Sequence, residues 1–159
     1  MVIVRLIGGL GNQLFQYATA RSVAHIKGVP LKIDVTPFSV YKLHKYSLSP
    51  FNISENFATS DEIAKVKCSK GFTGMRQRVS ALFRPYYRRP VVKERAFYFD
   101  PNILNVSGNV YLDGYWQTER YFKGIEELIR HEFTIKLKPD VLNMKTAEMI
   151  ANSNAISRH

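Results

Sequence analysis

The sequence predicts an α/β protein with a Rossmann-like parallel sheet and flanking helices. The first observation is VIVRLI at residues 2–7, a β-branched apolar run that suits a buried strand of a parallel sheet. The second is LKIDV at residues 31–35, a similar run that follows a helix-like segment. The third is that strand-like and helix-like segments recur further along the chain. Such alternation indicates parallel pairing, and the first three elements form a βαβ unit whose crossover should be right-handed.

Length and composition point to a folded domain. The chain has 159 residues, of which 45% are hydrophobic and 13% aromatic, so it can bury a sizeable core. Its one cysteine, Cys68, excludes an internal disulfide framework and fits a reducing compartment. The opening run is interrupted by Arg5, unlike a signal peptide, and no segment reaches the roughly 20 apolar residues that cross a membrane. We therefore expect a cytoplasmic protein.

The segment after the first strand predicts a helix that ends at Gly28. Asn12 is a suitable N-terminal cap, and glycine commonly follows the last helical residue. Arg21 falls on the apolar side of this helix, so it either extends past the core to water or pairs with a buried acid. The other residues on that side would pack on a sheet: Leu14, Tyr17, Ala18, Ala20 and Ala24.

The middle of the chain is less regular. Residues 38–53 are rich in aromatic and turn residues and predict a loop, and Asp61–Cys68 predicts a short helix. A basic excursion without a clean period is expected at about residues 67–90. Two more strands are expected at Ala96–Phe99 and Asn109–Asp113.

Two helices are expected in the last third. Thr118–Phe133 has apolar residues at helical spacing, with Thr118 as the N-cap. The last helix should run from Pro139, a good first helical residue, to about Ala151. Residues 1–153 would then form one Rossmann-like domain.

The turn after the first strand, GGLGNQ at residues 8–13, indicates a ligand site. Glycines allow a sharp turn and bring backbone N–H groups close to a ligand, and the N-terminus of the next helix favours anions. The amides of Asn12 and Gln13 add donors and acceptors at the same point. We predict that Gly9, Gly11, Asn12 and Gln13 bind substrate. The alternative is a tight strand-to-helix turn with no ligand.

Two known phosphate-binding motifs fit this turn poorly. The Gly-Lys-Ser/Thr of a P-loop is absent. The dinucleotide fingerprint would start at Gly9 and Gly11, but its third position is then Leu14. Asp34 lies at a suitable distance to bind a ribose, so a non-catalytic Rossmann module that binds a nucleotide or sugar nucleotide is an alternative interpretation.

A second cluster, YLDGYWQTERYF at residues 111–122, also lies between a predicted strand and helix. Tyr115 and Trp116 can stack on a sugar face, while Gln117 and Glu119 can bond hydroxyls. We predict that Asp113, Tyr115, Trp116 and Gln117 bind substrate; for Trp116 alone, an aromatic core anchor is the stronger interpretation. Because both turns follow strands of one sheet, we expect them at the same edge, in one site.

Charge is unevenly distributed. The formal net charge is +10, and residues 65–95 hold ten Lys or Arg but one acid, Glu94. A solvated basic insertion explains this, as would attraction to anionic membrane lipid, a nucleotide-type ligand or nucleic acid. No nucleic-acid motif is recognised, so no nucleic-acid partner is expected. No metal site is expected either, because Cys68 has no partner at metal-ligand spacing.

Several segments together resemble one enzyme family. GGLGNQLFQYATARSVAHIKGVPLKID at residues 8–34 resembles the N-terminus of the bacterial α-1,2-fucosyltransferases, glycosyltransferase family 11. The resemblance continues through FSVYKLHKYSLSPFNI and VVKERAFYFDP, and it is strongest at YLDGYWQTERYFKGIEELIRHEFTIK, residues 111–136.

The resemblance implies the N-terminal, acceptor-side half of a two-domain GT-B glycosyltransferase. Such an enzyme moves L-fucose from GDP-fucose to the 2-hydroxyl of a galactoside, with inversion and without a metal or other cofactor. By similarity, Asn12 would contact the donor's phosphate or fucose in the interdomain cleft, and Tyr115, Trp116 and Gln117 would line or support that cleft. The acceptor would be a galactose-containing glycan. If it is lipid-linked, the basic stretch could hold the protein at the inner face of the membrane.

The chain departs from the family at its C-terminal end. The family carries a His-x-Arg-Arg-Gly-Asp motif, whose arginines bind the donor diphosphate bidentately. Here the aligned segment is NAISRH, residues 154–159, which would begin a C-terminal nucleotide-binding domain; His159 would be the motif's histidine and a candidate catalytic residue. Without the arginines the leaving group lacks its charge stabilisation, so we expect no fucose transfer by the 159-residue chain alone.

Overall fold

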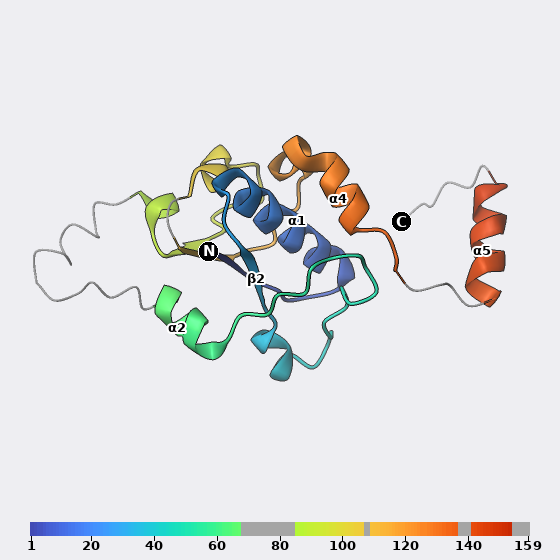
Figure 1. Cartoon of the computed structure of the whole chain (residues 1–159), viewed down its shortest axis with the longest axis horizontal. Helices are drawn as coiled ribbons and strands as arrows, with labels where there is room; N and C mark the ends of the chain where they lie inside the picture. The colour runs from blue at the N-terminus through green and yellow to red at the C-terminus, as the bar shows by residue number, and fades with distance from the viewer. Residues whose placement is uncertain (68–84, 107–108, 137–140, 154–159) are drawn as a thin grey trace, which may run out of the picture.

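Four parallel strands form the centre of the molecule (Figure 1). The computed structural model describes residues 1–67, 85–106, 109–136 and 141–153. The strands lie in the order β2-β1-β4-β3, and every pairing is parallel. Their bounds are β1 (Val2–Arg5), β2 (Leu31–Asp34), β3 (Val91–Lys93) and β4 (Val110–Asp113). The predicted α/β class with a parallel sheet is confirmed.

The central strands β1 and β4 are buried on both faces. Successive side chains of a strand point to opposite sides of the sheet, so each of these strands packs against a core on either side. Val2 and Val4 join the main core with α1 (Leu10–Lys27). Ile3 instead joins a smaller cluster on the other face, with Tyr111 and two side chains of α2 (Ser60–Lys67). Burial on both faces explains why the opening strand is a continuous apolar run.

Helix α1 packs as its sequence predicts, with one correction. Tyr17, Ala18, Ala20 and Ala24 are buried, and Leu14 is half-buried. The prediction that Asn12 caps the helix is wrong. The backbone of Gly9 is already extended (φ −71°, ψ 175°), so Gly9 is the N-cap, the helix begins at Leu10, and Asn12 lies inside the first turn.

Arg21 and Gly28 of α1 test two of the sequence predictions. Arg21 pairs with Glu132 of α4 (Glu126–Glu132), Nε to Oε1 at 2.8 Å, and Glu132 is only 8% exposed. The alternative of pairing with a buried acid is therefore the observed one. Gly28 ends the helix in the left-handed conformation, with φ 60°, and its N–H donates to the carbonyls of Ala24 and His25.

Helix α2 is reached through a loop that crosses from β2. The 3-10 turn η1 (Thr36–Ser39) comes first, and residues 40–53 contain no helix or strand, as predicted. Thr59 and Glu62 form a reciprocal cap for α2, with N–H to side-chain oxygen distances of 2.9 and 3.2 Å. The predicted helix at residues 61–68 is confirmed within one residue at its start, and Cys68 lies outside the described residues.

The strand predicted at Ala96–Phe99 is wrong, because the third strand lies earlier, at Val91–Lys93. Val92 is 1% exposed and fits the buried edge of the sheet, whereas Phe97 and Tyr98 are 89% and 73% exposed. Before β3 comes η2 (Tyr86–Arg88), and between β3 and β4 comes η3 (Pro101–Asn105). Most of the predicted basic excursion, residues 68–84, lies outside the described residues.

The single helix predicted at Thr118–Phe133 is also wrong. The segment divides into η4 (Glu119–Tyr121), η5 (Lys123–Ile125) and α4. Phe122 interrupts it with φ −128° and ψ 11°, two residues before Gly124, which has low helix propensity. Tyr121 and Phe122 contact different neighbours: the Tyr121 hydroxyl accepts from Asp100 N–H, and Phe122 packs on Phe15. Thr118 does cap the first turn, as predicted, by accepting from Arg120 N–H.

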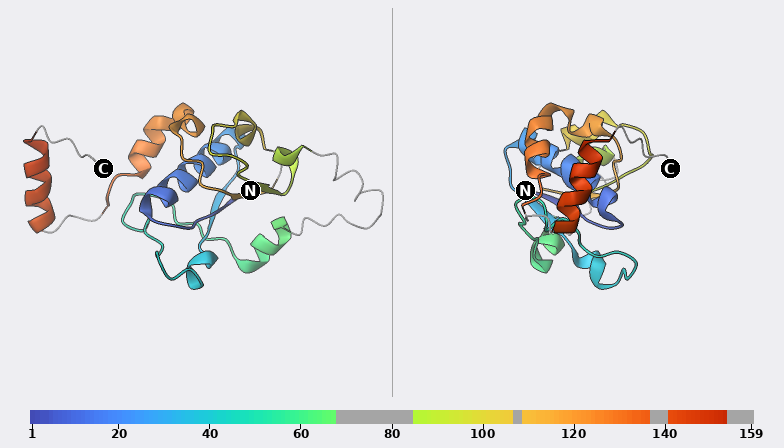
Figure 2. Two further views of the ribbon diagram at one scale, coloured as in Figure 1. Left: turned by 180° about the vertical axis from the view of Figure 1, so that it is seen from behind. Right: turned by 90° about the vertical axis from the view of Figure 1, so that its right-hand side faces the viewer.

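The last helix, α5 (Val141–Ala151), stands apart from the sheet in Figure 1 and in the left-hand view of Figure 2. It ends where the sequence predicts, although Pro139 lies outside the described residues. None of its residues is buried. Within the described part of the chain, no helix has the length and apolar character needed to cross a bilayer.

Candidate functional site

The two predicted ligand-binding turns meet at one edge of the sheet. Because β1 and β4 are parallel neighbours, the segments that follow them leave the sheet on the same side. There the Gln117 side chain donates from Nε2 to Oδ1 of Asn12, at 2.6 Å. Asn12 is half-buried and Gln117 is exposed, so the pair lies at an open surface. The expected juxtaposition is observed, and the substrate-binding role of these residues stays a prediction.

Glycines shape the first turn in two ways. Gly8 has φ +85°, and a Cβ there would lie 2.6 Å from Nδ2 of Asn12, so only glycine fits without displacing that amide. At Gly11, by contrast, a Cβ would meet nothing within 4 Å. Gly11 is exposed and leaves the first turn of α1 open to an approaching group. A Cβ added to Gly9 would lie 3.6 Å from Cε1 of His44, an ordinary contact distance.

Two buried glutamines support this turn from inside. Gln13 donates to the carbonyls of Gly8 and Lys45, at 2.8 and 2.9 Å, and accepts from Ser47 N–H at 2.9 Å. Gln16 bonds both the N–H and the carbonyl of Ile7. Both side chains are 0% exposed. The Gln13 amide therefore supports the loop through three internal hydrogen bonds, and its substrate-binding role stays a prediction.

The second turn is built around a glycine and a carboxylate. A Cβ on Gly114 would lie 2.4 Å from Cβ of Glu94 and 3.0 Å from the Trp116 ring. Glu94 accepts from the N–H of Tyr115 at 2.7 Å and from the N–H of Trp116 at 2.9 Å, one on each oxygen. Sequence reasoning missed Glu94 as a site residue, although it is the single acid within the basic stretch.

The remaining predicted residues of this turn differ in exposure. Asp113 forms an ion pair with Arg5 of β1, Oδ1 to Nη1 at 2.9 Å, and so links the two turns beneath the amide pair. Tyr115 is 36% exposed at the surface. Trp116 is 1% exposed and has φ 45°, a left-handed conformation that is uncommon outside glycine. Its ring borders a pocket and is also part of the core, so both interpretations of Trp116 have support.

Asp34, the predicted ribose ligand of a dinucleotide site, uses both of its carboxylate oxygens in hydrogen bonds within the protein. Its Oδ1 accepts from the N–H and hydroxyl of Thr36, at 2.9 and 2.6 Å, and its Oδ2 accepts from the Tyr111 hydroxyl at 2.6 Å. Burial and this hydrogen bond raise the pKa of Tyr111 above its ordinary value, so the hydroxyl stays a donor. Because Asp34 is 1% exposed, it offers no oxygen to a ribose.

Two further predictions concern His159 and metal binding. His159 lies outside the described residues, so its catalytic role stays a prediction. Among the described residues, no group of three His, Cys, Asp or Glu side chains is arranged to hold a metal ion.

Comparison with known proteins indicates the chemical class. No family model matches the chain, and no solved structure matches it significantly. Among curated proteins, the chain is 31% identical over 161 aligned residues to the alpha-1,2-colitosyltransferase of Escherichia coli. The match covers all of this chain and 53% of that enzyme, so the chain spans about half the length of its relative. The chain thus has a glycosyltransferase homologue, but one named for colitosyl and not fucosyl transfer.

Proposed function

We propose that this chain is the acceptor-side half of an α-1,2-glycosyltransferase. In this proposal the enzyme moves L-fucose from GDP-fucose to the 2-hydroxyl of a galactose-containing glycan, with colitose as the alternative sugar. The observation that carries the proposal is the 2.6 Å hydrogen bond between Asn12 and Gln117, which joins both predicted substrate-binding turns at an open surface. The similarity to a colitosyltransferase along the whole chain supports sugar transfer as the chemistry.

The N-terminus of α1 suits the anionic part of a sugar nucleotide. The first N–H groups of a helix have no acceptor inside the helix and carry the positive end of its dipole. The first turn of α1 holds no acidic side chain, and Gly11 leaves it sterically open. A diphosphate placed here would be stabilised as it departs, which lowers the barrier to transfer without a metal ion. In this arrangement Asn12 contacts the donor, and Tyr115 lies at the rim for the acceptor sugar.

A chimera tests whether this chain supports sugar transfer. It joins residues 1–153 of this chain to the remaining part of the E. coli colitosyltransferase. We expect transfer to a β-galactoside, and because the donor-binding half comes from the colitosyltransferase, the acceptor preference and the dependence on Asn12 are what report on this chain. Asn12→Ala should lower kcat/KM by about tenfold or more, because it removes a contact to the reacting sugar nucleotide.

The control for the chimera is Lys123→Ala, an exposed residue of η5 away from the amide pair, which should leave kcat/KM unchanged. A folded chimera that transfers neither sugar, or one whose rate ignores Asn12, would contradict the proposal. The 159-residue chain alone is expected to transfer neither.

The alternative of a non-catalytic nucleotide-binding module makes a different prediction. A dinucleotide-binding Rossmann domain uses an acidic side chain at the ribose, and Asp34 is already bonded to Thr36 and Tyr111. We therefore expect calorimetry to show no binding of NAD, and weak binding of GDP or GDP-fucose by the 159-residue chain. Tight NAD binding would favour the alternative.

We also propose peripheral contact with anionic membrane, where lipid-linked acceptors reside. Four exposed cations lie near β3 in the described residues: Arg88, Arg89, Lys93 and Arg95. Basic residues of this kind are attracted to anionic lipid within a Debye length. Sedimentation with vesicles should show more binding to phosphatidylserine than to phosphatidylcholine. Equal binding to both would remove this part of the proposal.

A further inference from the structure

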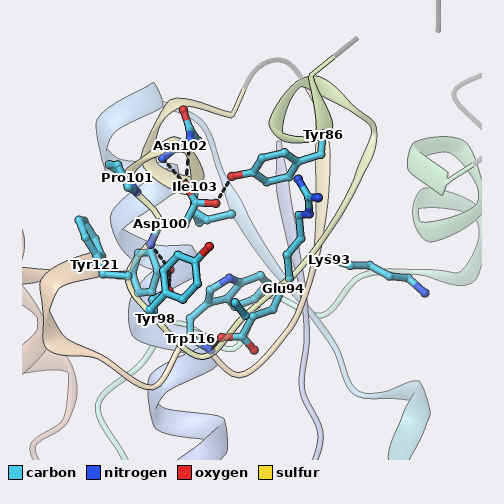
Figure 3. Close-up of a pocket in the computed structure, with 13 residues that line it drawn as sticks. Tyr86, Lys93, Glu94, Tyr98, Asp100, Pro101, Asn102, Ile103, Trp116 and Tyr121 are labelled. Carbon is cyan, nitrogen blue, oxygen red and sulfur yellow. Dashed lines mark hydrogen bonds between the residues drawn. The ribbon is translucent and has the colours of Figure 1, made fainter. Parts of the chain in front are cut away.

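A pocket of about 470 Å³ is bordered by Trp116, the residue before Gln117 (Figure 3). It opens between the loop that follows β3, the η3 turn and Trp116. This volume falls within the roughly 300–1,000 Å³ of small-molecule sites, so a sugar ring fits. Figure 3 shows Tyr86, Tyr98 and Trp116 around the same space.

The two carboxylates of the pocket are already occupied. Both oxygens of Glu94 accept from the backbone of the second turn. Asp100 accepts from the backbone N–H and side-chain amide of Asn102 on one oxygen, and from the Tyr86 hydroxyl on the other. These acids therefore hold the walls of the pocket in place and present few acceptors to a ligand.

Nitrogen donors also border the pocket. The Trp116 side chain is buried, yet its indole Nε1 has no hydrogen-bond partner in the described structure, and Figure 3 shows this nitrogen on the ring edge that faces the pocket. Arg95 lies over the Tyr86 ring, 4.8 Å from its centroid, and forms no ion pair with a described residue. Lys93 also borders the pocket, but its side chain points away in Figure 3. A buried donor without a partner is rare and favours a ligand that supplies an acceptor.

We propose that this pocket binds an acidic pyranose, a sugar ring that carries a carboxylate. The ring lies against Tyr98, which is 73% exposed and presents an aromatic face at the entrance. The carboxylate is bound by the Arg95 guanidinium, whose fork matches two carboxylate oxygens, and a ring hydroxyl or carboxylate oxygen accepts from the Trp116 indole.

This inference rests on the proposed function for its biological meaning. Trp116 borders the pocket and directly precedes Gln117, a member of the amide pair, in the second turn. An acidic sugar bound here would be a neighbour of the accepting galactose in the glycan. Acceptors that contain a uronic acid would then be preferred to neutral ones.

Trp116 is the only tryptophan of the chain, so its fluorescence reports directly on the pocket. The 159-residue protein is titrated with glucuronate, glucose and inorganic phosphate, and calorimetry repeats each titration independently of the fluorophore. We expect saturable binding of glucuronate, with glucose and phosphate each weaker by about tenfold or more, because only glucuronate satisfies both the aromatic wall and Arg95. Arg95→Ala should weaken glucuronate binding by a similar factor, and Tyr98→Ala should weaken the binding of both glucuronate and glucose.

Arg88→Ala is the matched control. It removes the same charge from the neighbouring η2 turn, and Arg88 does not line this pocket. It should leave glucuronate binding unchanged. Equal affinity for glucuronate and glucose, affinity for phosphate as high as for glucuronate, no binding of glucuronate in either measurement, or equal losses in Arg95→Ala and Arg88→Ala would each overturn the inference. Because binding is measured without a donor, failure of sugar transfer would not affect this result.

Discussion

The two turns that meet at the open edge are supported in different ways. The first is held from within the domain by Gln13 and Gln16, whose buried amides bond the loop backbone. The second is held by the carboxylate of Glu94, the residue that follows β3, and by the close approach of Gly114 to that residue. In both turns the supporting groups bond the backbone of the protein. This separation leaves Asn12 and Gln117 to meet at the surface, where a ligand can reach them.

The largest effect is expected for Gly114→Ala. The new Cβ would lie 2.4 Å from Cβ of Glu94, and backbone near both atoms prevents an easy shift. We expect a loss of about 3 kcal/mol in the free energy of unfolding, measured by urea denaturation. Gly11→Ala is the matched control: with nothing within 4 Å and a helical backbone, it should raise stability by about 0.5–1 kcal/mol. Similar losses in both variants would contradict this difference between the turns.

Gln13→Ala should have the next largest effect. It leaves the carbonyls of Gly8 and Lys45 and the N–H of Ser47 without their partner, at a cost of about 2–3 kcal/mol. Hydrogen exchange should show faster exchange of the Ser47 amide. Gln117→Ala provides the comparison, because an exposed glutamine should cost under about 0.5 kcal/mol. If both glutamines cost the same, the first turn is not supported from inside.

Glu94→Gln should destabilise the second turn by about 1–2 kcal/mol. The amide has one acceptor oxygen where the carboxylate has two, so one of the Tyr115 and Trp116 N–H groups loses its acceptor. Trp116 emission should shift to longer wavelength as its ring becomes hydrated. Glu126→Gln, at an exposed ion pair with Arg130, is the control and should leave both the emission and the stability nearly unchanged. An unshifted emission in Glu94→Gln would show that Trp116 is held by packing alone.

The smallest effect is the coupling between the turns themselves. A double-mutant cycle of Asn12→Ala and Gln117→Ala should give a coupling of about 0.5 kcal/mol, because their hydrogen bond competes with water at the surface. In the chimera, however, both variants should reduce transfer strongly. A coupling of zero, with additive effects on transfer, would mean that the two turns act independently.

Much of the fold was predictable from local pattern. The first two strands, α1 with its glycine end, and the parallel arrangement follow from apolar runs and their punctuation. Errors arose where aromatic residues made two segments ambiguous. The AFYF run at residues 96–99 has strand composition, but its side chains border a pocket or lie exposed. The 118–133 segment has helical spacing, but Tyr121 and Phe122 pack on different neighbours and divide it.

The site was predictable in position more than in detail. Glycine-rich and aromatic turns after two strands of one parallel sheet must lie on the same edge, so Asn12 and Gln117 could be expected near each other. Glu94 and the pocket beside Trp116 could not be expected, because each depends on contacts between residues distant in sequence. The internal hydrogen bonds of Gln13 could not be predicted either, since its partners Lys45 and Ser47 belong to a loop with no regular pattern.

The sequence by itself determined the βαβ start, the glycine turn and the class of sheet, because these depend on backbone freedom and on periodicities within short segments. Only the tertiary structure decided which polar side chains support the turns and which face the open edge. The physical reason is that a buried hydrogen-bonding group must find a partner wherever the fold brings one. Asp34 and Glu94 therefore bond the protein's own backbone and side chains, while the Trp116 indole N–H at the pocket has no partner among the described residues.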